Sequence, residues 1–147
     1  MCDSELKLKI SHFGIAVKSV DEAAIRYRQL GFHEIDGKFY VDALQRVQTR
    51  FLEKDGVIIE LIEAVGSIKD SPIKGYLKDS IHSIYHICYW AEDLEKAIET
   101  LKKSKYRLIS DILPGIGFGG RRICFMFNRY VGMIELVEAH LPDEARV

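Results

Sequence analysis

Two histidines and two glutamates recur at matching places in the two halves of this 147-residue chain. Residues 12–17 are echoed by residues 86–91, and the acidic segment 59–64 returns at 134–139 with nearly the same offset. Such self-similarity indicates a duplicated unit. A pseudo-twofold axis between the copies would bring four polar side chains to one place: His12, Glu60, His86 and Glu135. First-row divalent metals accept imidazole nitrogen and carboxylate oxygen, so we expect a metal site.

A buried hydrogen-bonded network of the same side chains is the alternative hypothesis. Glu60 and Glu135 each stand in the middle of an apolar run. Burying an ionised carboxylate is costly unless it is paired or coordinated. Either arrangement satisfies that condition, and the exact repetition of two ligand types favours the metal.

Hydrophobic periodicity predicts a strand, a helix and three further strands in the first half. The predicted strands are 8–18, 32–35, 47–53 and 57–64, and the helix is 22–30 after the capping residues 19–21. Asp55-Gly56 has the composition of a hairpin turn.

The second half repeats this plan. We predict strands at 83–91, 106–112, 121–128 and 132–139, and a helix at 94–103 opened by Asp93. A short helix near 72–79 joins the half-modules 8–64 and 83–139, and one domain spans 1–147. Because strand residues alternate faces, the four candidate ligands should lie on the face that the helices leave uncovered.

Composition excludes several classes of function. The net charge of −1 gives no electrostatic reason to expect nucleic acid or a membrane surface as a partner. Cys2, Cys88 and Cys124 cannot all pair, which favours a reducing, cytoplasmic setting. Cys88 and Cys124 should pack as small apolar side chains. No apolar run is long enough to span a bilayer, and no signal peptide is evident.

The run from Pro114 to Gly120 matches G-x-G-x-x-G formally. A dinucleotide site needs a helix after this motif, and the sequence predicts a strand there instead. We therefore expect a flexible loop at the mouth of the concavity.

Other charged side chains have weaker functional signals. Lys69, Lys74 and Lys78 near the connecting helix could meet a phosphorylated ligand, although a solvated face is the simpler interpretation. Glu63 and Glu138 should point away from the site into solvent, and His33, His82 and His140 have no repeat partner.

The motifs together resemble the vicinal oxygen chelate superfamily, which includes glyoxalase I, methylmalonyl-CoA epimerase, extradiol dioxygenases and bleomycin-resistance proteins. The resemblance spans nearly the whole chain and is greatest to the epimerase-like branch. It rests on SHFGIAVKSVDEA, IELIEA, DSPIKGYLKD, YHICYWAEDLEKAI and GMIELVEA. It implies an α+β fold in which tandem βαβββ modules form a curved, mostly antiparallel eight-stranded sheet with helices on the convex face.

The resemblance also implies a site and a reaction. The metal ligands would be His12, Glu60, His86 and Glu135, holding cobalt, nickel, manganese or zinc. Glu135 is the expected base that removes a proton α to a carbonyl, with Glu60 as its counterpart. Either carboxylate would have to loosen from the metal to accept a proton. The favoured activity is an epimerase or racemase of a 2-substituted acyl-CoA thioester, in a homodimer.

Two alternatives remain open. One is a glyoxalase-type lactoylglutathione lyase acting on a thiol hemithioacetal, and the other is a binding or resistance protein without catalysis. The chain departs from the epimerase pattern at Tyr85-His86 and at Phe127-Asn128. Thr49 stands where some epimerases use an acid as a second base, and a threonine cannot serve as that base.

Overall fold

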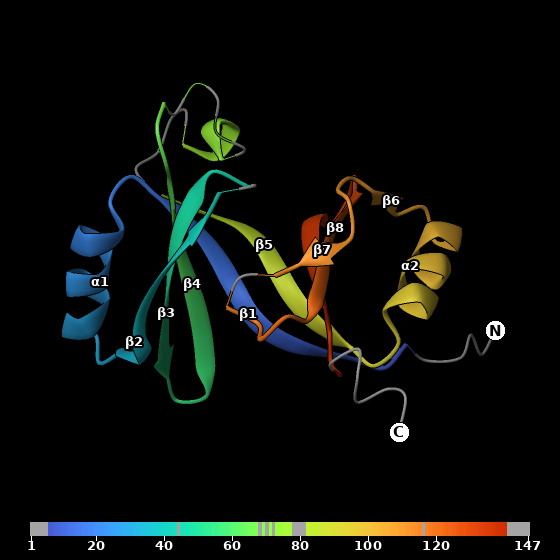
Figure 1. The fold of residues 1–147 in the computed structure, drawn as a ribbon, viewed down its shortest axis with the longest axis horizontal. Coiled ribbons are helices and arrows are strands. Elements are labelled where there is room, and N and C mark those ends of the chain that lie inside the picture. The colour runs from blue at the N-terminus through green and yellow to red at the C-terminus, as the bar shows by residue number, and fades with distance from the viewer. Residues whose placement is uncertain are drawn as a thin grey trace. The chain divides into compact units, whose positions relative to one another are not determined.

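The computed structural model contains two α-helices and nine strands over the residues that it describes (Figure 1). Those residues are 6–43, 45–67, 69, 71, 73–77, 82–115 and 117–140, without the side chains of 36–39. The chain divides into two compact units. The N-terminal unit is His12–Tyr85, and the C-terminal unit is His86–Val147 together with Met1–Ser11. The predicted α+β class with tandem βαβββ modules is confirmed.

The N-terminal unit is built on a sheet with strand order β2-β3-β4-β1. Its elements are β1 (Leu8–Val17, whose first four residues belong to the other unit), α1 (Val20–Gln29), β2 (His33–Asp42), β3 (Val47–Lys54) and β4 (Val57–Ala64). β1 runs parallel to β4, and β3 pairs antiparallel with both β2 and β4. Helix α1 lies along β3 and β4 in Figure 1 and packs on Ile59 and Leu61.

Local signals set the ends of these elements. The Ser19 side chain accepts a hydrogen bond from the backbone N–H of Glu22 and caps α1. Asp55 and Gly56 both have positive φ, 52° and 80°, as a tight two-residue hairpin turn requires. The predicted β3–β4 hairpin therefore forms at the expected place.

The C-terminal unit repeats the architecture. Its elements are β5 (His82–Ala91, whose first four residues belong to the other unit), α2 (Leu94–Lys103), β6 (Arg107–Leu108), β7 (Leu113–Pro114), β8 (Arg122–Asn128) and β9 (Gly132–Glu138). β5 runs parallel to β9, and β8 pairs antiparallel with β9, β6 and β7. Helix α2 packs on Ile134 and Leu136, so it covers one face of this sheet.

Two strand predictions were wrong in extent. The strand predicted at 32–35 continues to Asp42, because a register shift between Glu34 and Phe39 lets β2 resume its pairing with β3. The predicted strand 106–112 is divided into β6 and β7, which gives nine strands in place of eight. Between them the Ser110 hydroxyl accepts from the N–H of Phe125 at 2.7 Å, so a side chain replaces a carbonyl in the ladder.

The segment after β4 forms a shorter helix than predicted. A 3₁₀ turn, η2 (Lys74–Tyr76), is flanked by Ile73 and Leu77, which are buried against Ala16 and Ile62. Pro72, Lys78 and Asp79 of the predicted 72–79 helix lie outside the described residues. No helix in the described part of the chain is long and apolar enough to cross a membrane.

Candidate functional site

In the N-terminal unit, β1 and β4 bring His12 and Glu60 together. Nε2 of His12 lies 3.9 Å from Oε2 of Glu60. The residues are only 1% and 7% exposed. Glu60 is opposite Gly14 in the parallel register, and Gly14 shares a strand face with His12 because side chains alternate. Both therefore lie on the face opposite α1, as predicted.

In the C-terminal unit, β5 and β9 bring His86 and Glu135 together in the same way. Nε2 of His86 lies 3.0 Å from Oε2 of Glu135, and both residues are 2% exposed. Glu135 is opposite Cys88, two residues after His86, just as Glu60 is opposite Gly14. The structure thus pairs each predicted histidine with the glutamate of its own repeat.

A phenylalanine packs against each pair, a role that the sequence motifs did not predict. Phe51 is the cross-strand partner of Glu60, and Phe125 is that of Glu135. Each ring meets the repeat's histidine edge-on, with centroids 5.4 Å apart at His12 and 5.6 Å apart at His86. The rings cover the imidazoles with apolar surface, which strengthens electrostatic interactions there by excluding water. Comparing the repeats at the middle of their third strands would have revealed this residue.

Burial sets the charge of the second histidine. Desolvation lowers the pKa of His86 to about 3, so the imidazole is neutral at pH 7. Neutral imidazole is the form that binds metal. An imidazole nitrogen beside a buried carboxylate in each unit is a donor set that fits a divalent first-row ion.

Thr49 also lies on the site face of the N-terminal unit. It pairs with Ile62, is 8% exposed, and lies two residues before Phe51 on the same face of β3. A threonine hydroxyl cannot act as a carboxylate base at this position. Glu60 is therefore the acid that lies beside His12 in this unit.

The glycine-rich run is followed by strand β8, as predicted, where a dinucleotide motif would be followed by a helix. Phe118 is 9% exposed and its ring meets Trp90 edge-on at 6.1 Å. Arg121 places its guanidinium 5.9 Å from the centre of the same indole ring and donates to the Phe118 carbonyl at 3.0 Å. The loop is therefore pinned to β5 by an aromatic anchor, whereas the sequence analysis expected a flexible loop.

Glu63 and Glu138 are half-buried and hydrogen-bonded, so the prediction of solvated side chains was wrong. Oε2 of Glu63 accepts from the Val20 N–H at 3.3 Å and from Gln48. Glu138 accepts from Nε and Nη2 of Arg122 at 3.1 and 2.6 Å. Their partners come from other elements, which is why the local sequence did not reveal them. The expected burial of Cys88 and Cys124 is confirmed, and burial raises the pKa of Cys124 to about 12.

The model of the Glyoxalase/Bleomycin resistance protein/Dioxygenase superfamily matches residues 11–125. The chain belongs to this superfamily. The resemblance stated from the sequence motifs is therefore confirmed.

Two similar proteins are named as epimerases. The chain is 32% identical over 119 residues to the ethylmalonyl-CoA/methylmalonyl-CoA epimerase of Cereibacter sphaeroides, covering 80% of this chain and 87% of that protein. It is 28% identical over 134 residues to human mitochondrial methylmalonyl-CoA epimerase, covering 89% and 74%.

Solved structures agree. Methylmalonyl-CoA epimerase from Mycobacterium tuberculosis matches with a TM-score of 0.78 at 24% identity, covering 100% of this chain and 97% of that one, and this match shows the fold. A Streptomyces coelicolor methylmalonyl-CoA epimerase variant in complex with 2-nitronate-propionyl-CoA matches with a TM-score of 0.75 at 25% identity, covering 93% and 100%.

Proposed function

We propose that this protein is a metal-dependent epimerase of a 2-substituted acyl-CoA thioester. The relatives named as epimerases support the reaction class. The assignment of catalytic and metal-binding residues rests on one observation in the chain itself. Each repeat holds a buried histidine and glutamate in the same strand register, 3.9 Å apart in one unit and 3.0 Å apart in the other. Buried carboxylates kept in both copies imply a shared role.

The proposed metal site takes its four ligands from both repeats: His12, Glu60, His86 and Glu135. Two imidazole nitrogens and two carboxylates suit cobalt, nickel, manganese or zinc, and this donor set does not select among them. When bound, such an ion would supply Lewis acidity where negative charge develops on the thioester oxygen.

Glu135 is the proposed base. Its carboxylate removes the α-proton, the C–H bond breaks, and the electron pair moves into the thioester carbonyl to give an enolate. Glu60, the repeat-related acid, would enter this step protonated and loosened from the ion; it gives its proton to the opposite face of the α-carbon, which inverts the centre and leaves Glu135 protonated and Glu60 ionised. Glu135 is only 2% exposed, so little water surrounds the carboxylate during the step.

His86 and the neighbouring ring orient this base. Nε2 of His86 stands 3.0 Å from the Glu135 carboxylate, and Phe125 covers the imidazole edge-on at 5.6 Å. A carboxylate fixed by its neighbours approaches the α-carbon in one direction, which raises the rate by orientation.

The test starts from each separated epimer of methylmalonyl-CoA and of ethylmalonyl-CoA. The proposal predicts that both epimers of an accepted substrate reach the same mixture, and that Glu135→Gln and Glu60→Gln each slow this by at least about 100-fold. Glu138→Gln, which changes an acid on the opposite face of β9, is the matched control and should retain activity. If the protein interconverts the epimers of neither CoA ester and instead turns over a thiol hemithioacetal, the proposed epimerase activity is contradicted and a lyase activity is supported.

A further inference from the structure

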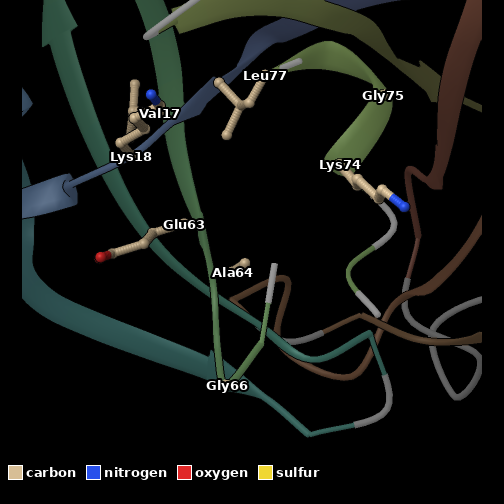
Figure 2. Close-up of a pocket in the computed structure, with 8 residues that line it drawn as sticks. All are labelled: Val17, Lys18, Glu63, Ala64, Gly66, Lys74, Gly75 and Leu77. Carbon is tan, nitrogen blue, oxygen red and sulfur yellow. The ribbon is translucent and has the colours of Figure 1, made fainter. Parts of the chain in front are cut away.

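A pocket of about 620 Å³ opens at the ends of β1 and β4 in the N-terminal unit (Figure 2). Its volume lies within the range of small-molecule sites. The residues that line it are Val17, Lys18, Glu63, Ala64, Gly66, Lys74, Gly75 and Leu77. They come from both strand ends and from the η2 turn, so the pocket is formed by three separate segments of one unit.

The lining combines an apolar floor with cationic edges. Val17 and Leu77 are buried, whereas Lys18 and Lys74 are exposed. In Figure 2 the two lysines lie on opposite sides of the hollow. Neither forms an ion pair with any residue that the structure describes, so both ammonium groups are available to an anionic ligand.

The one acid in the lining is already engaged. Glu63 accepts hydrogen bonds from the first N–H of α1 and from Gln48, and in Figure 2 its carboxylate points away from Leu77 and Lys74. A carboxylate at a helix N-terminus interacts favourably with the helix dipole, which offsets its charge. The pocket as a whole therefore favours a ligand with apolar surface and negative charge.

The pocket stands at a defined distance from the His12–Glu60 pair. Ala64 lies four residues beyond Glu60 on the same face of β4, which is about 13 Å at the usual rise of a strand. Between them Ile62 is covered by Ile73 and Leu77. A ligand that reaches from the pair to the pocket must therefore be long and must run along the η2 segment, which supplies Lys74 and Gly75.

We infer that this pocket binds the phosphate-bearing nucleotide end of the acyl-CoA substrate. Lys18 and Lys74 contact phosphate oxygens, and the floor formed by Val17, Ala64 and Leu77 packs against the apolar parts of the molecule. The long arm of CoA separates this end from the reacting thioester. The choice of ligand rests on the proposed function. Lys18 and Lys74 then increase the affinity for the substrate and take no part in the proton transfer.

The kinetic test compares an acyl-CoA with the matching acyl-pantetheine, which lacks the phosphates. Lys18→Ala/Lys74→Ala should raise KM for the acyl-CoA by about tenfold, because two charge-assisted contacts are lost, and leave kcat unchanged. KM for the acyl-pantetheine should stay the same. Lys102→Ala/Lys103→Ala removes two exposed lysines elsewhere and is the matched control. An equal KM change for both substrates, or none for either, would overturn the inference.

A second measurement does not depend on turnover. Calorimetry with adenosine 3′,5′-bisphosphate should show binding to the wild-type protein that weakens with added salt and is lost in Lys18→Ala/Lys74→Ala. If the protein binds the bisphosphate through these lysines but lacks epimerase activity, the assignment of the pocket is supported and the proposed reaction is contradicted. Absence of binding, binding that the double variant retains, or equal affinity for inorganic phosphate would overturn the pocket's assignment.

Discussion

His12 and His86 occupy the same position in two copies of one motif, and the equivalence extends beyond the ligand types. In each copy the glutamate lies opposite the residue two places after the histidine, and a phenylalanine lies opposite the glutamate. An arrangement that served only packing would tolerate apolar replacement in one copy, because buried polar groups cost free energy. Retention of all three residues in both copies supports a chemical role.

At the residue scale, the metal content should depend on both histidines. His12→Gln and His86→Gln should each weaken metal binding by more than about 100-fold, since loss of a ligand exceeds the effect of losing an outer partner. Elemental analysis after dialysis should find one ion per wild-type chain and little in either variant. His33→Gln changes an exposed histidine without a repeat partner and should keep the ion. Full metal content in both site variants would contradict the ligand assignment.

At the scale of elements, Glu63 and Glu138 perform related tasks at the ends of β4 and β9. Glu63 accepts from the first N–H of α1, and Glu138 binds Arg122, which also pairs with Glu95 of α2 at 2.6 Å. Each acid therefore ties a strand end to another element of its own unit. Their stability roles are separate from the proposed chemistry, because they lie on the helix-covered face.

This pairing predicts a defined dependence of stability on pH. The side-chain hydrogen bond from Arg122 lowers the pKa of Glu138 below its ordinary value of 4.5. A carboxyl group with a lowered folded-state pKa stabilises the fold above the unfolded value, and that stability is lost as pH falls through the folded value. Glu138→Gln should cost about 1 kcal/mol at pH 7 and almost nothing in strong acid.

Urea titrations at a series of pH values measure this difference. Glu92→Gln, which removes a more exposed acid 3.8 Å from Lys7, should change the pH profile little. A Glu138→Gln profile that runs parallel to the wild-type profile down to strong acid would show that the Arg122 pair contributes no stability.

The glycine-rich loop gives a second prediction at this scale. A Cβ on Gly115 would lie 2.6 Å from Cγ2 of Ile123 and 2.9 Å from Cδ2 of Phe118. Both neighbours are buried, so Gly115→Ala should lower the free energy of unfolding by about 1–3 kcal/mol through overpacking. A Cβ on Gly75 meets nothing within 4 Å, and Gly75→Ala should change stability by less than about 0.5 kcal/mol. Equal denaturation midpoints for the two variants would show that the loop is not closely packed.

Local patterns predicted most elements but not the contacts between them. The caps Ser19 and Asp93 and the Asp55-Gly56 turn act through neighbouring residues, so their elements were found close to their observed ends. The interruption at Ser110 depends on a bond to a different strand, which no local pattern reveals. The four site residues were found because duplication marks them, whereas the pocket is formed by segments with no common motif.

At the scale of the whole molecule, the account depends on the two repeats acting as one domain. Each unit supplies one histidine and one glutamate, which is half of the proposed ligand set. Two imidazoles and two carboxylates supply four ligands to a divalent ion, whereas one pair alone leaves most coordination positions to water. The predicted homodimer adds nothing to this requirement and can be tested separately by light scattering.

The central claim is that Glu135 removes the α-proton of an acyl-CoA thioester in a metal-dependent step. Its most direct test is uptake of deuterium from D₂O into methylmalonyl-CoA and related 2-methylacyl thioesters, followed by mass spectrometry with and without a chelator. The account predicts exchange that the chelator abolishes, that Glu135→Gln loses, and that Glu138→Gln on the same strand retains. No exchange by metal-loaded protein across the panel, or undiminished exchange by Glu135→Gln, would contradict it.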